Sequence, residues 1–528
     1  MRGNPIKFSN FSAGLNTMDG PYLVTTGECR DCSNVTSTAR GSIVRRNGVT
    51  TFADAPSSTS YNSLFALETS VSSATRKALI AVHGNTIYAI NGVAARSTIK
   101  TGVTSGVTWE FCSYPGTTTP GAPAYAFGMN GSDTPQKWTG DTATTMSDWV
   151  ATAGTGLGSV PNGRYVVNWQ GRLWVAGVGG NGSRLYYSGV GDAYNWPSTN
   201  FADVFDSADG EDITGLATVG AYLVVFKRSK IWVVYDVDVD LGPLTRVVSR
   251  NIGTCSHRSV VETPNATLFL TPDKGVWSTD GSTVKDLSAK VRPSFNLDSS
   301  IETNACAAYW NNHYYVSIPT LAHSSAGDDV LMDYDMQLQS WWKHTVPAQQ
   351  LVTWRKTAGG AALLYGIRAS SRGTSTLPGI DVYFGSTQVN DNGFDFASSW
   401  TSAWHSFDVP HIRKRLRRMV FDGSGLFNTF LSTDFSTAWY SYATLSLSVA
   451  SDSYAFGIVG GPSFGTAGGI FGGSASATSK SVYGIGGDIA ATPPKTALGK
   501  TISIKFEGSS PNGMTVNAYT MSITPRKN

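Results

Sequence analysis

The densest charge in the sequence is a block of five cations within six positions, namely Arg413, Lys414, Arg415, Arg417 and Arg418. Such a block can contact the phosphates of a nucleic acid, or it can pair with carboxylates of a neighbouring subunit. Successive side chains of a strand alternate between its two faces, so we expect that the block cannot all face one partner. We favour pairing with a neighbouring subunit. Neither interpretation includes base readout, because the sequence contains no helical recognition motif.

A second charged cluster is acidic and comprises Asp203, Asp206, Asp209, Glu211 and Asp212. Paired carboxylates can hydrolyse glycosides or hold calcium. The twelfth position counted from Asp203 is Thr214, where a calcium-binding EF-hand loop requires Glu. We therefore interpret Asp206, Asp209, Glu211 and Asp212 as carboxylates of a loop that faces water or a negatively charged lumen.

Other residue types with reactive side chains are scattered. Cys29 and Cys32 form a single Cys-x-x-Cys pair, and no second pair stands at zinc spacing. We expect free thiols, no metal and no cofactor. The seven His form no His-x-x-x-His pattern, and no nucleophile, base and orienting group recur at a recognisable spacing. The sequence therefore predicts a protein that is not an enzyme.

The elements around these residues are strands. Residues 221–227 and 230–235 are β-branched and aromatic runs joined by a short turn, and similar pairs recur along the chain. Their anchors are spaced 40 to 50 residues apart and stand at Ile87, Phe127, Leu173, Leu223, Leu268, Tyr314 and Leu363. A period near 45 residues with strand-type runs is typical of a β-propeller. The count predicts about seven blades, with six or eight as alternatives, and independent β-sandwiches as the other architecture.

Composition agrees with an all-β protein of more than one domain. The 528 residues are 41% hydrophobic but only 15% charged, and they include 57 Gly and 15 Trp. The net charge of +3 is too small to indicate a nucleic-acid or membrane partner by itself. No apolar segment is long enough to span a membrane, and no signal peptide is visible.

We divide the chain into three parts. Residues 1–60 form an N-terminal arm, whose strand around Ile43 to Phe52 should complete a blade near the last one. Residues 61–390 form the propeller. Residues 391–528 form a C-terminal β-sandwich domain, with strand-like alternation at 402–409 and a Gly/Ser-rich loop at 455–490.

Several segments resemble one family in their order along the chain. Residues 8–17 read FSNFSAGLNT and residues 41–48 read GSIVRRNG. Residues 183–196 read SRLYYSGVGDAYNW, followed by DGEDITGL at 209–216 and GVWSTDG at 275–281. This series resembles the tail nozzle, or tail tubular protein B, family of short-tailed bacteriophages. Ala13 departs from the family's pattern, which has Gly there.

The resemblance implies a structural virion protein, made in the host cytoplasm, that acts as one subunit of a tail-tube ring through which the genome is ejected. It implies a homo-oligomer, most often a hexamer, beside a portal or adaptor ring and other tail proteins. Tail fibres and the passing DNA are further possible contacts. Two alternatives stay open: a receptor-binding or fibre-docking propeller of the virion, and a propeller glycosidase or sialidase.

Overall fold

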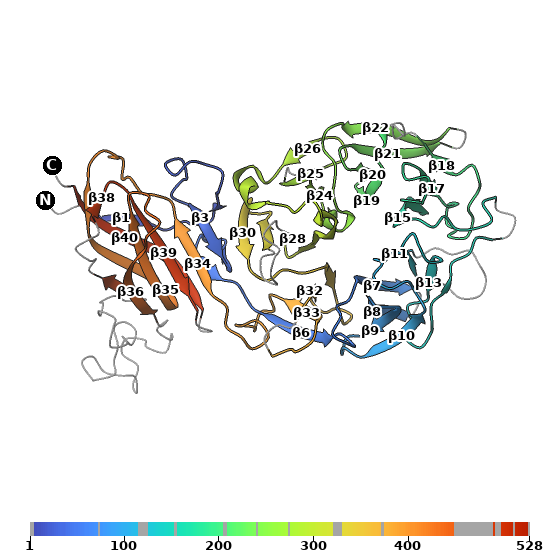
Figure 1. The fold of residues 1–528 in the computed structure, drawn as a ribbon, viewed down its shortest axis with the longest axis horizontal. Helices are drawn as coiled ribbons and strands as arrows, with labels where there is room; N and C mark the ends of the chain where they lie inside the picture. Colours follow the sequence, from blue (N-terminus) through green and yellow to red (C-terminus); the bar gives the residue numbers. More distant parts are fainter. Residues whose placement is uncertain are drawn as a thin grey trace.

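The structure is a computed structural model. It describes residues 5–71, 74–114, 125–152, 156–203, 209–238, 241–272, 275–319, 330–370, 374–447, 489–491, 498–509 and 513–525. Strands dominate these ranges, in seven four-stranded sheets and one larger sheet. Figure 1 shows the seven small sheets as a ring at one end and the larger sheet at the other, with both termini at its far edge.

The first three blades are antiparallel sheets in chain order. Blade one contains β7 (Ser63–Val71), β8 (Ala74–His83), β9 (Thr86–Ile90) and β10 (Arg96–Thr101). Blade two contains β11 (Glu110–Ser113), β12 (Ala126–Met129), β13 (Gln136–Trp138) and β14 (Ser147–Asp148). Blade three contains β15 (Tyr165–Trp169), β16 (Arg172–Ala176), β17 (Leu185–Tyr187) and β18 (Phe201–Ala202).

The next three blades repeat this order. Blade four contains β19 (Ile213–Val219), β20 (Tyr222–Lys227), β21 (Ile231–Asp238) and β22 (Gly242–Ser249). Blade five contains β23 (Val261–Glu262), β24 (Thr267–Thr271), β25 (Gly275–Thr279) and β26 (Val284–Asp286). Blade six contains β27 (Cys306–Trp310), β28 (His313–Ile318), β29 (Val330–Asp335) and β30 (Ser340–His344).

Blade seven joins two distant parts of the chain. It contains β31 (Leu351–Trp354), β32 (Leu363–Arg368), β33 (Gly379–Tyr383) and the N-terminal strand β6 (Val49–Asp54). The first strands of successive blades are neighbours around the ring, and β31 lies beside β7. The predicted seven-bladed propeller is therefore confirmed, and a strand from the N-terminal part completes its last blade.

The completing strand is shorter than the sequence indicated. Residues Ile43–Arg45 form β5, which pairs with a strand of the larger sheet. The chain crosses to the propeller at Gly48, where an added Cβ would lie 1.8 Å from the Asn390 carbonyl oxygen. Only β6, which starts directly after this close crossing, belongs to blade seven.

The larger sheet combines both ends of the chain. Its N-terminal strands are β1 (Pro5–Phe8), β2 (Gly14–Leu15), β3 (Glu28–Ser33), β4 (Val35–Ser37) and β5. Its C-terminal strands are β34 (Ser398–Ser402), β35 (Lys414–Thr433), β36 (Tyr440–Leu447), β37 (Ile489–Ala491), β38 (Leu498–Gly499), β39 (Ile502–Gly508) and β40 (Met514–Pro525). We call this unit the second domain. The N-terminal segment thus supplies five strands to it.

The long strand β35 runs through both halves of the second domain. It pairs with β40 over its first part and with β39 over its last part. At the end of the part paired with β40, Gly423 and Gly425 pass so close to that strand that an added Cβ would lie 2.1 Å from a backbone oxygen. Glycines and a register shift at this point bend the sheet, so that it folds over one core.

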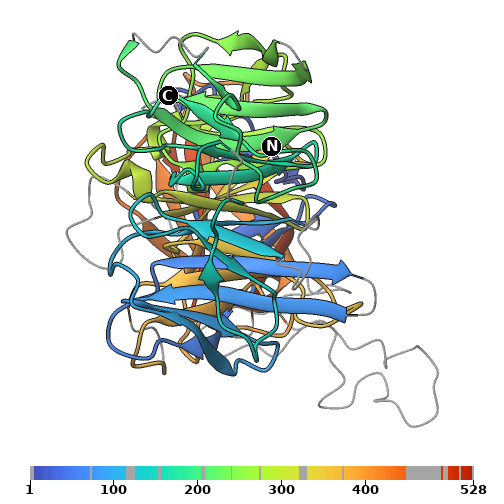
Figure 2. The ribbon, with the colours of Figure 1, turned by 90° about the vertical axis from the view of Figure 1, so that its right-hand side faces the viewer.

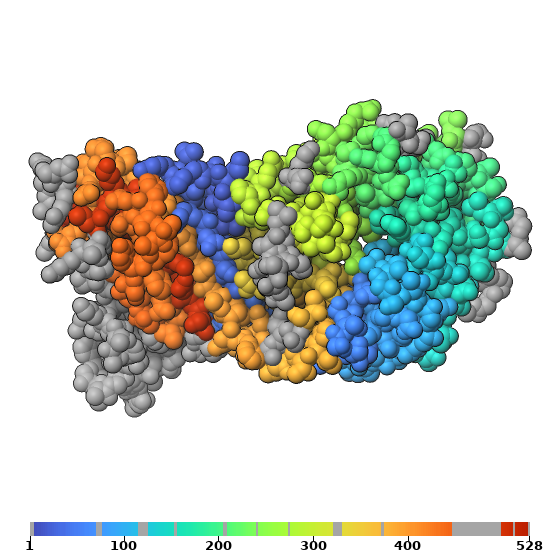
Figure 3. Space-filling view, in the orientation of Figure 1, coloured from blue at the N-terminus to red at the C-terminus, as the bar shows by residue number. Residues whose placement is uncertain are grey.

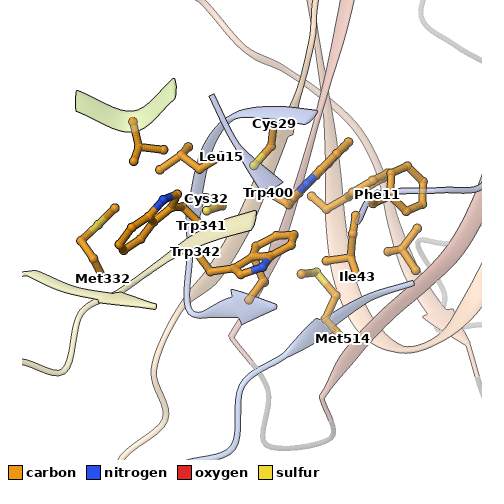
Figure 4. Close-up of a cluster of buried hydrophobic side chains, with 14 of the residues drawn as sticks. Phe11, Leu15, Cys29, Cys32, Ile43, Met332, Trp341, Trp342, Trp400 and Met514 are labelled. Carbon is orange, nitrogen blue, oxygen red and sulfur yellow. The ribbon is translucent and has the colours of Figure 1, made fainter. Parts of the chain in front are cut away.

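One hydrophobic core joins the second domain to the propeller. Phe11, Leu15 and Trp400 from the second domain lie in the same cluster as Trp341 and Trp342 of blade six. Figure 4 shows these rings and the neighbouring thiols between the ribbons of both units. In Figure 3 the N-terminal segment, in blue, fills the space between the C-terminal sheet and the blades, and Figure 2 shows the blades in front of the second domain.

Two smaller features complete the fold. The short 3-10 helices η2 (His257–Ser259), η3 (Ala289–Ser294) and η4 (Glu302–Asn304) are connectors, and no helix in the described ranges is long and apolar enough to cross a membrane. The strand expected at 402–409 ends at Ser402. Phe407 and Asp408 have left-handed φ angles of 54° and 60°, which make a turn instead of a strand. Most of the Gly/Ser-rich segment 455–490 lies outside the described residues.

Candidate functional site

The cationic block lies at the beginning of β35, in the half of the second domain that is farther from the propeller (Figure 1). Lys414 differs from the four arginines because its side chain is buried. Its Nζ donates hydrogen bonds to the carbonyl oxygens of Val409 and Lys500. Burial lowers the pKa of this ammonium group. Lys414 therefore fastens two loops to the sheet and does not face a partner.

A β-bulge changes the direction of the next side chains. Leu416 pairs with Ile523 and Arg418 pairs with Ser522, so Arg417 is the extra residue of the bulge. Two consecutive residues of a bulged strand oppose one residue of its partner. Arg417 and Arg418 are accordingly both exposed, although they are adjacent in sequence.

The four arginines consequently share the outer face of the strand. Leu416, Met419 and Phe421 belong to the core, whereas Arg413 is exposed and Arg415 is half-buried on the other side. The expectation that the block of five cannot all face one partner is confirmed, because Lys414 is buried. The bulge nevertheless interrupts the alternation and brings the four arginines to one face.

The outer face around the arginines is polar. Thr524 lies opposite Arg415 and accepts a hydrogen bond of 3.3 Å from the Nε of Arg417. Ser522 lies opposite Arg418 on β40. None of the four arginines forms an ion pair with a carboxylate among the described residues. We call Arg413, Arg415, Arg417 and Arg418 the arginine face.

Two carboxylates of the acidic cluster, Asp203 and Asp209, form ion pairs within the chain. Asp209 accepts hydrogen bonds from the Nζ atoms of Lys227 and Lys230, at 3.0 Å and 2.6 Å. Despite partial burial, these bonds lower the pKa of the Asp209 carboxyl to about 2. The Asp209 side chain is only 12% exposed, which differs from the expectation that it faces water or a lumen.

The other carboxylates have separate partners. Glu211 accepts hydrogen bonds from the backbone and hydroxyl of Ser229. Asp203 forms a two-pronged ion pair with Arg184. Asp212 is exposed and lies against Gly182. Asp206 lies outside the described residues. The described carboxylates thus hold the loop before β19 to neighbouring turns and are not placed as an acid and base pair.

The axis of the propeller is crossed by one side chain. Arg258 precedes β23 of blade five, diametrically opposite blades one and two in the ring. Its Nη2 donates to the Asn62 carbonyl and to Ser63 Oγ at the start of β7, at 2.9 Å and 3.0 Å. Its Nε lies 3.4 Å from Glu110 Oε1, at the start of β11. Arg258 therefore joins opposite sides of the ring.

His257 fills the space beside Arg258. Its ring packs on Tyr165 of blade three, with 4.8 Å between centroids, and its Nδ1 accepts a 3.4 Å hydrogen bond from the Leu216 amide of blade four. Burial lowers the pKa of His257, although the Glu110 carboxylate raises it. At the end where the first strands begin, the Arg258 side chain therefore bridges opposite sides of the ring.

Sequence reasoning missed the joint between the two domains. Arg46, between β5 and β6, forms a two-pronged ion pair with Asp391, at 2.9 Å and 2.7 Å. Its Nε donates to Asn34 Oδ1 at 2.8 Å, and its guanidinium lies 3.7 Å from the centre of the Phe396 ring. The Arg46 side chain is 2% exposed. Both chain crossings between the domains are thus tied to each other, by residues 345 positions apart.

Further polar contacts fix the N-terminal segment on blade six and on η3, the connector before it. The Asn34 amide donates to the Lys343 carbonyl at 2.9 Å, and Lys343 Nζ pairs with Asp31 at 2.7 Å. Lys290 Nζ lies 2.6 Å from the buried carboxylate of Glu28. The joint therefore combines apolar packing with charged contacts along its edge.

The cysteines and histidines give no metal centre within the described part of the chain. Cys29 and Cys32 are free, buried thiols in the core shared by the two domains. Burial, together with Cys32, raises the pKa of Cys29 well above its usual value. Both thiols pack among the apolar side chains of this core.

Several solved structures are similar to this chain at low sequence identity. No family model and no curated protein matches the chain. BamB from Moraxella catarrhalis is similar with 11% identity and a TM-score of 0.33, over 73% of this chain and 99% of that one. The Pan2 WD40 domain of Neurospora crassa has 8% identity and a TM-score of 0.38, over 65% and 98%.

An enzyme is also among the similar structures. The exo-beta-1,3-galactanase of Phanerochaete chrysosporium has 9% identity and a TM-score of 0.22, over 80% of this chain and 97% of that one. Scores this low carry no argument about function. The architecture follows from the strand pairing itself.

Proposed function

We propose that this chain is a structural virion protein and one subunit of the tail-tube, or nozzle, ring through which a short-tailed bacteriophage ejects its genome. The supporting observation is where the resembling segments lie. Phe11, Gly14 and Leu15 of the first segment pack between the second domain and blade six. Arg46 and Gly48 of the second segment form the joint.

This placement gives the resembling segments a mechanical role. An added Cβ at Gly14 would lie 2.8 Å from the Trp341 carbonyl oxygen, so the N-terminal segment passes in close contact with blade six. Together with the pair of Arg46 and Asp391, it packs the propeller against the second domain through one shared core. A rigid two-part subunit suits a ring that must keep its shape while a genome passes.

The closed axis decides where the conduit lies in this proposal. Arg258 bridges opposite sides of the propeller, so in this proposal DNA does not pass through the axis of a single subunit. The conduit is instead bounded by several subunits around a common symmetry axis. The propeller then serves as a rigid body beside the conduit.

The experiment is to measure the mass of the purified protein by mass photometry and to image it by negative-stain electron microscopy. We expect closed rings, with six copies as the resemblance implies. A monomer at micromolar concentration, alone or mixed with its neighbouring tail proteins, would refute the proposal. Binding to host cells as a separate spike would favour the receptor-binding alternative.

The enzymatic alternative has its own test. We expect purified protein to release no sugar from host surface glycans. A variant with Asp209→Ala and Asp212→Ala is the matched control. Glycan cleavage that is lost in this variant would identify a glycosidase and overturn the structural assignment.

A further inference from the structure

The arginine face has a composition that separates it from the rest of the molecule. Elsewhere, Arg46, Arg184 and Arg258 each pair with a carboxylate, whereas the half-buried Arg30 and Arg172 donate hydrogen bonds to backbone or hydroxyl oxygens. On the outer face of β35, four guanidinium groups stand without such a pair among the described residues. Holding like charges together costs free energy unless anions lie opposite.

The arrangement of the arginines is linear. Arg413 directly precedes β35, Arg415 follows two positions later on the same face, and the bulge adds Arg417 and Arg418 beside each other. A guanidinium group can bind a phosphate with two parallel hydrogen bonds. A row of such groups matches a chain of regularly spaced phosphates better than a single anion.

The neighbouring strands extend this surface with donors. Thr520, Ser522 and Thr524 of β40 lie across from residues of the arginine strand, and their hydroxyls can donate to phosphate oxygens. Lys7 lies opposite Thr520 on β1 and is exposed. The carboxylate on this stretch of β35 is Asp422, which accepts a 3.1 Å hydrogen bond from Asn517.

The surface lacks what a protein partner requires. No large hydrophobic residue is exposed on residues 5–8, 413–421 or 514–525. Protein interfaces place apolar or aromatic anchors at their centre, whereas interfaces with nucleic acid are more polar and more positively charged. This composition favours phosphates over a neighbouring subunit's carboxylates as the partner of the arginine face.

We propose that the arginine face binds the phosphate backbone of a nucleic acid, without reading its bases. The absence of exposed aromatic rings on these strands agrees with backbone contact, because single-stranded bases are usually held by stacking. The proposal concerns the surface of one subunit and does not depend on ring formation.

The test measures binding of the full chain to a fluorescein-labelled 20-base-pair DNA of random sequence by fluorescence anisotropy, across a range of NaCl concentrations. We expect binding that weakens steeply with salt. Removing two phosphate contacts in an Arg417→Ala/Arg418→Ala variant should reduce the slope of log K against log[salt] by about 1.8. At 50 mM salt the same relation gives an affinity loss of about tenfold per contact.

Two further variants keep the result interpretable. Arg250→Ala with Lys285→Ala removes two exposed cations from the propeller and should bind DNA like the unaltered chain. Arg417→Lys with Arg418→Lys keeps the charge and should retain most of the salt slope. Thermal unfolding of each variant checks that the second domain is intact.

Three outcomes would overturn the proposal. The first is DNA binding that the Arg417→Ala/Arg418→Ala variant leaves unchanged. The second is binding to vesicles of anionic phospholipid without binding to DNA, which would assign the face to a membrane. The third is loss of self-association in that variant with DNA affinity unchanged, which would assign it to carboxylates of another copy. Mass photometry reports self-association separately, so failure of the ring proposal can be told from failure of this one.

Discussion

Replacing Asp391 by Asn should loosen the joint between the propeller and the second domain. The change keeps the shape of the side chain but removes the charge that faces Arg46, whose side chain is 2% exposed. Breaking a buried ion pair by removing one partner costs about 3–5 kcal/mol, because the other charge stays buried without compensation. We expect a loss of that size in the free energy of unfolding of Asp391→Asn.

The chain offers a matched control for this variant. Arg184 and Asp203 also form a two-pronged pair, but their side chains are 29% and 40% exposed. Water and ions screen such a pair, and exposed pairs contribute about 0–1 kcal/mol. Asp203→Asn should therefore cost far less than Asp391→Asn.

The assay is equilibrium unfolding in urea, followed by tryptophan fluorescence. Trp341, Trp342 and Trp400 are buried in the core shared by the two domains, so opening of the joint should change their emission. Limited proteolysis should also cut Asp391→Asn between the domains before it cuts the unaltered chain. Equal costs for Asp391→Asn and Asp203→Asn would refute the reasoning that this joint depends on a buried charge pair.

Three other predictions follow from buried charges. Burial lowers the pKa of His405 to about 4, so between pH 6.5 and 4 the unfolded chain binds a proton that the folded chain does not bind. The free energy of unfolding should therefore fall by about 3 kcal/mol as pH drops from about 6.5 to 4. His405→Gln should reduce this pH dependence in urea unfolding measured at several pH values. The pKa of Asp209 is lowered to about 2, so its stabilisation is present above about pH 4 and lost as pH falls toward 2; Asp209→Asn should be less stable than the unaltered chain at pH 7 and equal to it near pH 2. Arg258→Met leaves the Glu110 carboxylate without its cation on the propeller axis and should cost about 3 kcal/mol in urea unfolding, whereas Arg250→Met, at an exposed position, should cost little.

The propeller could be predicted because each blade repeats the same local pattern. Six of the seven anchors lie in the second strand of their blades, as Leu173 does in β16 and Leu223 in β20. Ile87 lies instead in the third strand, β9, which explains why the first interval between anchors is the shortest. The predicted number of blades is still seven, because each blade contains one anchor whichever of its strands holds it.

The features that depend on distant contacts could not be predicted. Arg46 and Asp391 are far apart in sequence, and neither carries a local signal of the joint. Nothing in the sequence around Arg258 indicates its contact with Glu110, because the two residues meet only when the blades close into a ring. Periodicity finds strands, but it does not show which polar side chains meet.

The cationic block illustrates a different limit. Its residues were recognised from charge alone, but the side on which each lies depends on a register shift between Leu416 and Arg418. An alternation rule assumes a regular strand, and a bulge breaks it without a clear signal in the sequence. The structure therefore separates the buried Lys414 from the four arginines, which share one face.

The most direct test of the proposed tail-tube role is electron cryo-microscopy of the purified protein, with enough particles to determine symmetry. We predict a closed ring whose conduit lies between subunits, with each propeller axis still crossed by Arg258. Monomers that never assemble, or a ring in which the conduit runs through the individual propellers, would contradict the account.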